Sequence, residues 1–409
     1  MNRTTSDRFT DYLPLFFFIC LSGNPLFITG KFQKPILIGF AVLFIAYSLY
    51  YITAKAVNRG LGLLLISAGF ILLLSMFQRY ALGYVSYPGV FALILKIALG
   101  MFLLVYYQCI GVNPYHLYIR TLSFLTKVSL PLFALNFVKF FGLPLDVYYT
   151  KSQFFYTSFD LPKELLRNSG MFWEPGAFAG YLLVALLLVV VYNQGFTLQR
   201  YRKESIWITI GVVSTLSTTG LVVLAFMILF YVNTNYHFGK FLLLPMLAVG
   251  GYFAYNNLEV LGEKMEEQYN EAAQMEKTDV SNTRFGALNM DLQYITDQPF
   301  TGNGLDKRTR YRFHPWVDDD LGHGNGMSNF LVYWGIPFFL FWMWCVFRFA
   351  WRSSGKVSIG LAFVFLLLLT LQGEQFLNYP VFLLFFTAPA IDFHWDDEPL
   401  AELTPVPAG

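Results

Sequence analysis

The chain has 409 residues, of which 56% are hydrophobic and only 13% are charged. Ordinary soluble domains carry about 25% charged residues, so this composition excludes a soluble globular protein and indicates one that crosses a membrane several times. The formal net charge of +2 provides no strongly basic surface, and we expect no nucleic-acid partner. The cysteines, Cys20, Cys109 and Cys345, all fall in apolar runs and are predicted to be small buried side chains, not a disulfide set or a metal site.

Apolar runs recur along the whole chain at close to the roughly 20 residues that cross a bilayer. They predict an all-α polytopic membrane protein of about twelve transmembrane helices, organised as one integral-membrane domain over residues 1–409. The predicted spans are Tyr12–Thr29, Ile36–Ile52, Leu61–Phe77, Val90–Ile110, Thr121–Phe141, Pro175–Tyr192, Ile206–Leu216, Thr218–Val232, Phe241–Ala254, Ser328–Phe349, Val357–Leu371 and Phe376–Ile391.

Short basic loops predict the orientation of these spans, because Lys and Arg gather in cytoplasmic loops. Such loops follow the second, sixth and tenth predicted spans. Their basic residues are Lys55 and Arg59, then Arg200, Arg202 and Lys203, then Arg348, Arg352 and Lys356. All three loops can share one side only if the run from Ile206 to Val232 crosses the membrane twice and turns within Ser214–Gly220. With this count, both termini are expected to be cytoplasmic.

Two polar segments then face outward, Gly142–Glu174 and Tyr255–Met327. The second, between the ninth and tenth spans, is predicted to be a helical periplasmic subdomain. One helix is expected to begin after Ser281-Asn-Thr283, because these residues are typical of a helix start. Its apolar face is predicted to consist of Phe285, Leu288, Leu292 and Ile295, which recur at helical spacing. Gly302-Asn-Gly304 then predicts a turn of the chain.

The most informative segment begins at Arg167 and reads RNSGMFWEPGAFAGY. It joins the first outward segment to the apolar run that starts at Pro175, and proline suits the first turn of a helix because its missing N–H would be unbonded there. Arg167 and Glu174 are therefore expected at the membrane boundary, where an unpaired charge is costly. One interpretation is a capped helix start with an interfacial charge. The other is a site for an anionic, membrane-tethered substrate.

Further polar residues precede the tenth span. A basic cluster contains Lys307, Arg308, Arg310 and Arg312. His314 follows, and then His323, which is flanked by glycines and stands close to Asn325 at the membrane boundary. Glu374 lies in the predicted turn between the last two spans, either as an exposed turn residue or beside Glu174 at the same outer face. No metal-ligand spacing is recognisable, so no metal is predicted.

Five segments resemble the superfamily of O-antigen polymerases and O-antigen ligases, which are bacterial membrane glycosyltransferases of the C type. They are Arg167–Tyr181, the Ser214–Gly220 turn, the run Arg284…Pro299…Gly302-Asn-Gly304, His323–Asn329 and Gly373-Glu-Gln…Pro380. Their order and spacing cover nearly the whole chain. The form NSGMFWEPGAFA is more similar to the polymerase branch. Two positions depart from the ligase pattern: Thr218 stands where ligases often carry an arginine, and Gly324 separates His323 from Asn325.

The resemblance implies polymerisation of polyprenyl-diphosphate-linked oligosaccharide repeat units at the periplasmic face of the bacterial inner membrane, without a metal or other cofactor. A sugar hydroxyl would attack, and polyprenyl diphosphate would leave. Arginine suits contacts to a diphosphate, and histidine or a carboxylate suits activation of the hydroxyl. The residues expected to bind diphosphate or glycan are Arg167, Arg284, Arg308, Arg310, Asn325 and Glu374. His323 is the first choice of base, with Glu174 and His314 as alternatives.

Other functions remain open at this stage. An O-antigen ligase would transfer the glycan to lipid A-core or to a protein by the same chemistry. A flippase for the same lipid-linked glycan belongs to a different class, and the concentration of polar groups in one outer loop, away from the membrane midplane, speaks against it. Besides the lipid-linked glycan and the bilayer, a chain-length regulator is a candidate partner.

Overall fold

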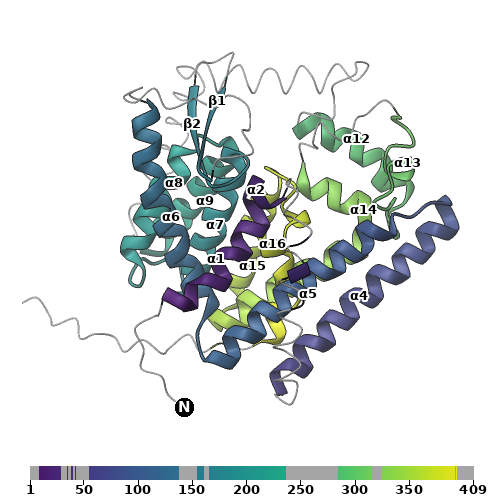
Figure 1. The fold of residues 1–409 in the computed structure, drawn as a ribbon, viewed down its shortest axis with the longest axis horizontal. Coiled ribbons are helices and arrows are strands. Elements are labelled where there is room, and N and C mark those ends of the chain that lie inside the picture. Colours follow the sequence, from purple (N-terminus) through teal and green to yellow (C-terminus); the bar gives the residue numbers. More distant parts are fainter. Residues whose placement is uncertain are drawn as a thin grey trace, which may run out of the picture.

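The computed structural model describes residues 9–28, 35, 38–39, 42, 55–137, 154–160, 165–235, 284–315, 325–391 and 393. These residues form a mostly helical protein around one large apolar core (Figure 1). The helices are α1 (Phe9–Gly23), α2 (Pro25–Ile28), α4 (Lys55–Leu82), α5 (Tyr87–Ile110), α6 (Pro114–Phe137), α7 (Pro175–Tyr192), α8 (Arg202–Ser214), α9 (Thr218–Asn235), α12 (Arg284–Asp297), α13 (Lys307–Arg310), α14 (Gly326–Ser354) and α15 (Val357–Leu371).

Five helices in the described part of the chain are long and apolar enough to cross a membrane: residues 59–82 of α4, α5, α7, α9 and α14. The protein is therefore a mostly helical membrane protein. Helices α7 and α15 have the bounds of the sixth and eleventh predicted spans. The predicted spans Ile36–Ile52 and Phe241–Ala254 lie largely or wholly outside the described residues, so the count of twelve stays a prediction.

The prediction of one continuous helix over Phe376–Ile391 is wrong. The chain instead forms short turns, which are η3 (Phe376–Asn378), α16 (Pro380–Leu383), η4 (Leu384–Phe386) and η5 (Ala388–Ala390). Pro380 and Pro389 lack the N–H that a continuous helix needs at these positions. The segment is nevertheless buried, and its turn α16 lies between α1 and α5 (Figure 1). Lys96 of α5 donates from Nζ to the Asn378 carbonyl oxygen at 2.9 Å, which satisfies one of its backbone groups.

The expectation of a purely α-helical chain also misses a hairpin before α7. Strands β1 (Tyr156–Asp160) and β2 (Leu165–Gly170) pair antiparallel, with Ser158 opposite Arg167. The buried side chain of Asn168 fixes β2 on the helices, since its Nδ2 donates to Ser129 Oγ at 3.2 Å and to Ser214 Oγ at 3.0 Å. Alternation of apolar residues is too short here to predict a strand pair from the sequence.

Helix α14 is broken at Gly335, where φ is 75° and ψ is 170°. The outer loop fills the break with its own backbone. Asn303 N donates to Val332 O at 2.6 Å, Gly304 N donates to Tyr333 O at 3.1 Å, and Ile336 N donates to Pro299 O at 2.7 Å. Both glycines of the predicted Gly302-Asn-Gly304 turn have positive φ, which confirms a tight turn. The break leaves no unbonded backbone at these positions, as burial in an apolar bundle requires.

The three basic loops gather at one end of the bundle. Helices α8 and α9 form two separate segments joined within Ser214–Gly220, as expected, and this places the Arg200–Lys203 loop at the end where α7 finishes. Lys356 Nζ donates to Gln194 O at 2.8 Å, so the loop after α14 lies at the same end.

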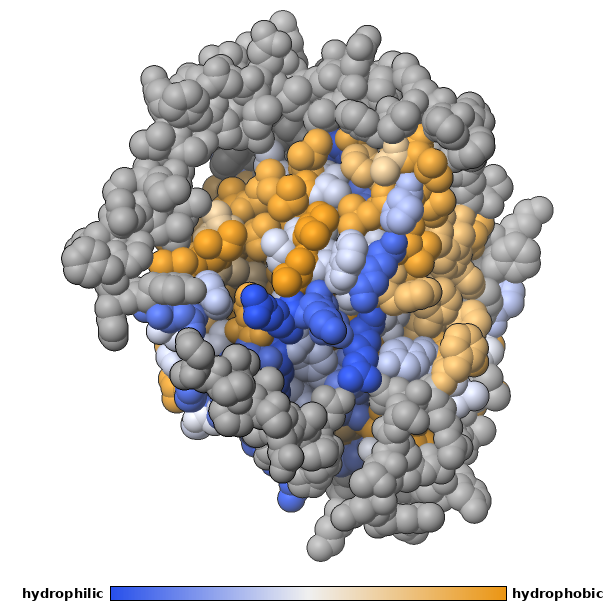
Figure 2. Space-filling view, turned by 90° about the vertical axis from the view of Figure 1, so that its left-hand side faces the viewer, coloured by the Kyte–Doolittle hydropathy of each residue, from blue (hydrophilic) through white to orange (hydrophobic). Residues whose placement is uncertain are grey.

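The first basic loop, at the start of α4, lies at the same end as the other two, next to the end of the Phe376–Ile391 segment. Arg352 Nη1 donates to Pro389 O at 3.0 Å. A Cβ placed on Gly60 would lie 3.2 Å from Ile391, next to that contact, so the start of α4 is at the same end as well. The start of α7 and the end of α15 lie at the opposite end. Figure 2 shows the face that carries α6 and α8, where a broad apolar surface adjoins a group of hydrophilic side chains.

We expect Gly335→Ala to destabilise the protein more than Gly355→Ala. Both glycines have positive φ, of 75° and 70°, so both substitutions introduce backbone strain of about 1–2 kcal/mol. Only at Gly335 would the new Cβ meet backbone, at 2.5 Å from Phe300 O, whereas nothing lies within 4 Å at Gly355. Crowding should add about 1–3 kcal/mol for Gly335→Ala alone. Thermal unfolding in detergent measures the difference, and equal midpoints would contradict the inserted-loop arrangement.

Candidate functional site

Two glutamate side chains converge at the start of α7. A Cβ placed on Gly176 would lie 3.2 Å from Glu174 Oε1 and 3.0 Å from Glu374 Oε1. The two carboxylates therefore face one small space above the first turn of α7, although Glu374 follows α15, 200 residues later in the chain. The expectation that Glu374 stands beside Glu174 is confirmed by this geometry. A methyl group at this position would require both carboxylates to shift by a few tenths of an ångström.

Glu174 is the residue before α7, with extended backbone at φ −160° and ψ 166°. Its side chain makes no capping hydrogen bond, and its Oε1 is buried without a hydrogen-bond partner among the described residues. A buried, unbonded carboxylate oxygen is costly, and such atoms call for an explanation by function or by a bound group. This oxygen is suited to accept a hydrogen bond from a hydroxyl group of a ligand.

The turn that carries Glu374 is held by the start of α14. Asn325 Nδ2 donates to Gln372 Oε1 at 2.7 Å, and Asn325 Oδ1 accepts the hydrogen bond of Ser328 N at 3.1 Å. A Cβ on Gly326 would lie 2.6 Å from the carbonyl carbon of Glu374, so the two backbones touch. Asn325 therefore caps α14 and tethers the turn, which is a supporting role visible in the structure. Binding of substrate by Asn325 stays a prediction.

Arg167 on β2 is bonded to the turn between α8 and α9. Its Nε donates to Thr215 O at 3.1 Å, and one Nη donates to Leu216 O at 3.4 Å. These carbonyl groups lie at the end of α8, where the helix dipole favours a positive charge. The same turn lies against the segment that carries Glu374, because the Thr219 side chain lies 3.4 Å from the Cβ position of Gly373. Arg167 thus holds the hairpin against the edge of the site, and its contact with a diphosphate remains a prediction.

Much of the segment Arg167–Tyr181 packs in the core. The Phe172 and Tyr181 rings stack with centroids 4.3 Å apart, and the Tyr181 hydroxyl bonds Ser22 Oγ at 3.0 Å. Trp173 stacks on Tyr379 with centroids 4.5 Å apart. The aromatic residues of this segment are therefore explained by packing of α7 against α1 and the Phe376–Ile391 segment, and Glu174 is the member that packing leaves unexplained.

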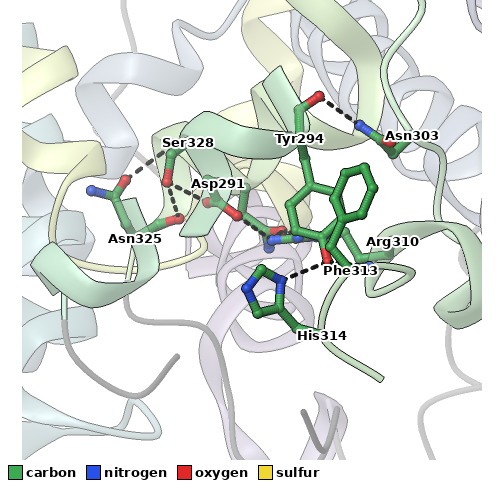
Figure 3. A network of polar contacts seen from close by, with 9 residues as sticks. Asp291, Tyr294, Asn303, Arg310, Phe313, His314, Asn325 and Ser328 are labelled. Carbon is green, nitrogen blue, oxygen red and sulfur yellow. Dashed lines mark hydrogen bonds and ion pairs between the residues drawn. The ribbon is translucent and has the colours of Figure 1, made fainter. Parts of the chain in front are cut away.

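Arg310 does not serve as an exposed anion ligand. Its side chain is 1% exposed, and one Nη lies 2.5 Å from Oδ1 of Asp291, whose side chain is 0% exposed (Figure 3). Nε and the same Nη also donate to Asn329 Oδ1, at 3.2 and 3.0 Å. Burial in this ion pair argues against substrate binding by Arg310, because a diphosphate could reach it only by breaking the pair; binding by Arg310 stays a prediction.

Asp291 is absent from the predicted site residues, because the predicted apolar face of α12 includes Leu292 and not Asp291. Ile295 of that face does pack against the buried cluster. The buried residues of this helix include Ala287, Met290, Asp291 and Tyr294, while the predicted face residue Leu292 is 47% exposed. The buried set also follows helical spacing, with an aspartate inside an apolar stripe. That aspartate was the signal in the sequence that could have identified the network.

Arg308 lies on the surface, with a side chain 63% exposed. Its Nε and one Nη each lie 2.9 Å from the carboxylate oxygens of Asp306, and its guanidinium carbon lies 3.9 Å from the Tyr84 ring centroid. The hydrogen bonds from Arg308 lower the pKa of Asp306. The pair ties α13 to the loop between α4 and α5. Substrate contact by Arg308 is untested, and the side chains of Arg284 and His323 lie outside the described residues.

His314 is held by the hydroxyl of Tyr294, with Nδ1 and Oη 3.0 Å apart (Figure 3). Tyr294 Oη already accepts the N–H of Phe313 at 3.1 Å, so assignment of the hydrogen-bond network places its own proton on the line to Nδ1. Burial, and then the charge of Arg310, lower the pKa of His314. With Nδ1 accepting this hydrogen bond, a neutral His314 ring carries its proton on Nε2, which argues against His314 as the base.

No group of three His, Cys, Asp or Glu side chains among the described residues could hold a metal ion. Within the part of the chain that the structure covers, the site thus consists of the Glu174–Glu374 carboxylates, the turn held by Arg167 and the start of α14. In comparisons with known proteins, no protein-family model, no curated protein and no solved structure matches this chain.

Proposed function

We propose that the protein is a membrane glycosyltransferase that polymerises polyprenyl-diphosphate-linked oligosaccharide repeat units. The observation that carries the proposal is the Glu174–Glu374 pair at the start of α7, with one buried oxygen of Glu174 that has no hydrogen-bond donor among the described residues. A sugar hydroxyl supplies such a donor. The pair lies at the end of a wholly buried apolar helix, where an acceptor sugar and a lipid-linked donor can meet at the membrane surface.

In the proposed reaction, the acceptor hydroxyl oxygen attacks the anomeric carbon of the donor sugar. The bond from that carbon to the diphosphate oxygen breaks, polyprenyl diphosphate leaves with the electron pair, and the hydroxyl proton passes to a carboxylate. Glu174 is the described residue that fits the role of base, and His323 stays a prediction outside the described residues. Positioned general-base catalysis contributes about 10²–10⁴-fold. Arg167, at the edge of the site, is the candidate that balances the charge of the departing diphosphate.

The alternative classes differ in what supports them. A ligase would use the same carboxylates and the same leaving group, so it differs from the polymerase in its acceptor alone. The way in which the break in α14 is closed argues against a flippase. Transporters typically bind their substrate at backbone groups exposed by broken helices, and here the outer loop already bonds the groups at the Gly335 break.

Location follows from the two ends of the bundle. We place the end with the three basic loops in the cytoplasm and the carboxylate end in the periplasm of a bacterial inner membrane, because basic loops are retained inside. The substrate implied by this arrangement is a lipid-linked glycan presented at the outer leaflet.

Cysteine labelling tests this orientation in a variant whose native cysteines are replaced by alanine. We expect Lys307→Cys in α13 to react with a membrane-impermeant maleimide in intact spheroplasts. Gln199→Cys, in the loop between α7 and α8, should react only after the membrane is opened. Both positions are exposed, so unequal labelling reports the membrane and not burial. The reverse labelling pattern would place the carboxylate pair on the cytoplasmic side and contradict a periplasmic reaction.

Transfer itself is tested with purified protein and a synthetic polyprenyl-diphosphate repeat unit. Glu174→Gln should lower the rate of polymer formation about 10²–10⁴-fold while the unfolding temperature stays close to wild type, because the change removes a base and keeps the shape. Glu204→Gln, at the start of α8, is the matched control and should leave the rate unchanged. Arg167→Lys should retain part of the rate, since lysine keeps the positive charge but lacks the planar guanidinium group that can donate two parallel hydrogen bonds to a phosphate.

Polymer formation by Glu174→Gln at the wild-type rate would remove Glu174 as the base. Product that appears only when lipid A-core or a protein acceptor is added would identify the ligase alternative. Movement of unpolymerised repeat unit across proteoliposomes, with no new glycosidic bond, would identify the flippase.

A further inference from the structure

We propose that Asp291, Arg310 and Ser328 form a positioning network that sets Glu374 in place for the reaction through the first turn of α14. This inference rests on the proposed function of the Glu174–Glu374 pair. It assigns a task to the buried ion pair between α12 and α13.

Asp291 uses both carboxylate oxygens to join three helices (Figure 3). Oδ1 accepts from Arg310 Nη at 2.5 Å, and Oδ2 accepts from Ser328 Oγ at 2.5 Å. Arg310 in turn bonds Asn329 Oδ1, in the same turn of α14 as Ser328. All four side chains are buried. The network therefore connects α12 and α13 of the outer segment to the beginning of α14.

A contribution to stability is a weak account of this ion pair. Removing two charges from water is costly, and replacing a buried pair by apolar side chains of similar volume is often neutral or stabilising. The directional hydrogen bonds of the ion pair instead hold the bonded side chains in one arrangement. The restricted element here is the first turn of α14, since Ser328 and Asn329 receive the bonds.

That turn also contacts the turn that carries Glu374. Ser328 N bonds Asn325 Oδ1, and Asn325 Nδ2 bonds Gln372 Oε1 at 2.7 Å. Gly326 lies so close to the backbone of Glu374 that a Cβ there would come within 2.8 Å of Gln375 Cα as well. A shift of the α14 start must therefore move the Glu374 turn. Misplacement of a reacting group by about 1 Å can cost about 10²-fold in rate.

Ser328→Ala tests the proposal, because it removes one link of the network and no charge. We expect kcat for polymer formation from the synthetic repeat unit to fall roughly tenfold, with KM within about twofold of wild type, because the carboxylate moves and the lipid-binding surface does not. Ser328→Thr restores the hydroxyl and should recover most of kcat. The control is Ser354→Ala, which removes another buried hydroxyl at the far end of α14, where Oγ bonds Ala350 O at 2.7 Å.

A double-mutant cycle with Glu374→Gln separates positioning from general destabilisation. If Ser328 acts through Glu374, Ser328→Ala should cost less than about twofold in the Glu374→Gln background, because the carboxylate it positions is already absent. If transfer by the Glu374→Gln protein falls below detection, Glu374→Asp replaces it. This change withdraws the carboxylate from its position, so Ser328→Ala should again cost less than in the wild-type background. If Ser328→Ala fails to fold, the paired change Asp291→Leu with Arg310→Met removes the network without leaving an unpaired charge.

The outcomes are distinct. Two results would overturn the positioning role without touching the proposed function. One is equal kcat for the Ser328→Ala and Ser354→Ala proteins, and the other is a double variant whose loss in kcat equals the product of the losses of the Ser328→Ala and Glu374→Gln proteins. Absence of transfer by the folded wild-type protein would overturn the proposed function itself.

Discussion

Burial of α7 along its whole length constrains where this protein can place charge. All 18 residues from Pro175 to Tyr192 are buried, so no polar group can be accommodated along the helix without a partner. Charges are displaced to its two ends. At one end the basic loops meet, tied together by contacts such as Lys356 with Gln194. At the other end Glu174 lies just before Pro175, and it faces the carboxylate of Glu374.

The same constraint explains how irregular backbone is tolerated inside the bundle. The break at Gly335 is closed by the Pro299–Gly304 loop, and the short turns after Phe376 are supported by neighbours such as Lys96. Each departure from helix geometry is thus matched by a donor or an acceptor from another segment. The outer segment is consequently joined to the membrane bundle at several places, which include the Gly335 break, the Asp291 network and the contact of Arg308 with Tyr84.

Hydropathy predicted those parts of the fold that depend on residues close together in the sequence. The bounds of α7 and α15 follow from uninterrupted apolar runs, and the division between α8 and α9 follows from loop charge. The β1–β2 hairpin and the broken Phe376–Ile391 segment were not predicted, since both depend on packing between distant residues, as with Gly100 against Leu384. The apolar composition of Phe376–Ile391 does not show whether the segment forms one continuous helix or is broken at its two prolines.

The candidate site was predicted in part, for similar reasons. Glu174 and Glu374 were recognised because acidic residues at the membrane boundary stand out against apolar runs. Arg310 was expected to bind substrate and instead lies buried against Asp291. The aspartate at helical spacing within the buried face of α12 is the signal that the prediction overlooks, because it places Leu292 on that face. Arg167 is a mixed case, since its bonds to the α8–α9 turn account for the residue without any ligand.

The central claim is that the space between Glu174 and Glu374 is where the reaction occurs, and Gly176→Ala probes that space directly. The new methyl group would lie 3.2 and 3.0 Å from the two carboxylate oxygens, which are ends of flexible side chains and can move aside by a few tenths of an ångström. Alanine also favours the helix, so the fold should be retained. The account predicts that the folded variant forms polymer about tenfold more slowly than wild type in the purified assay. A wild-type rate would show that the carboxylate geometry does not govern the reaction.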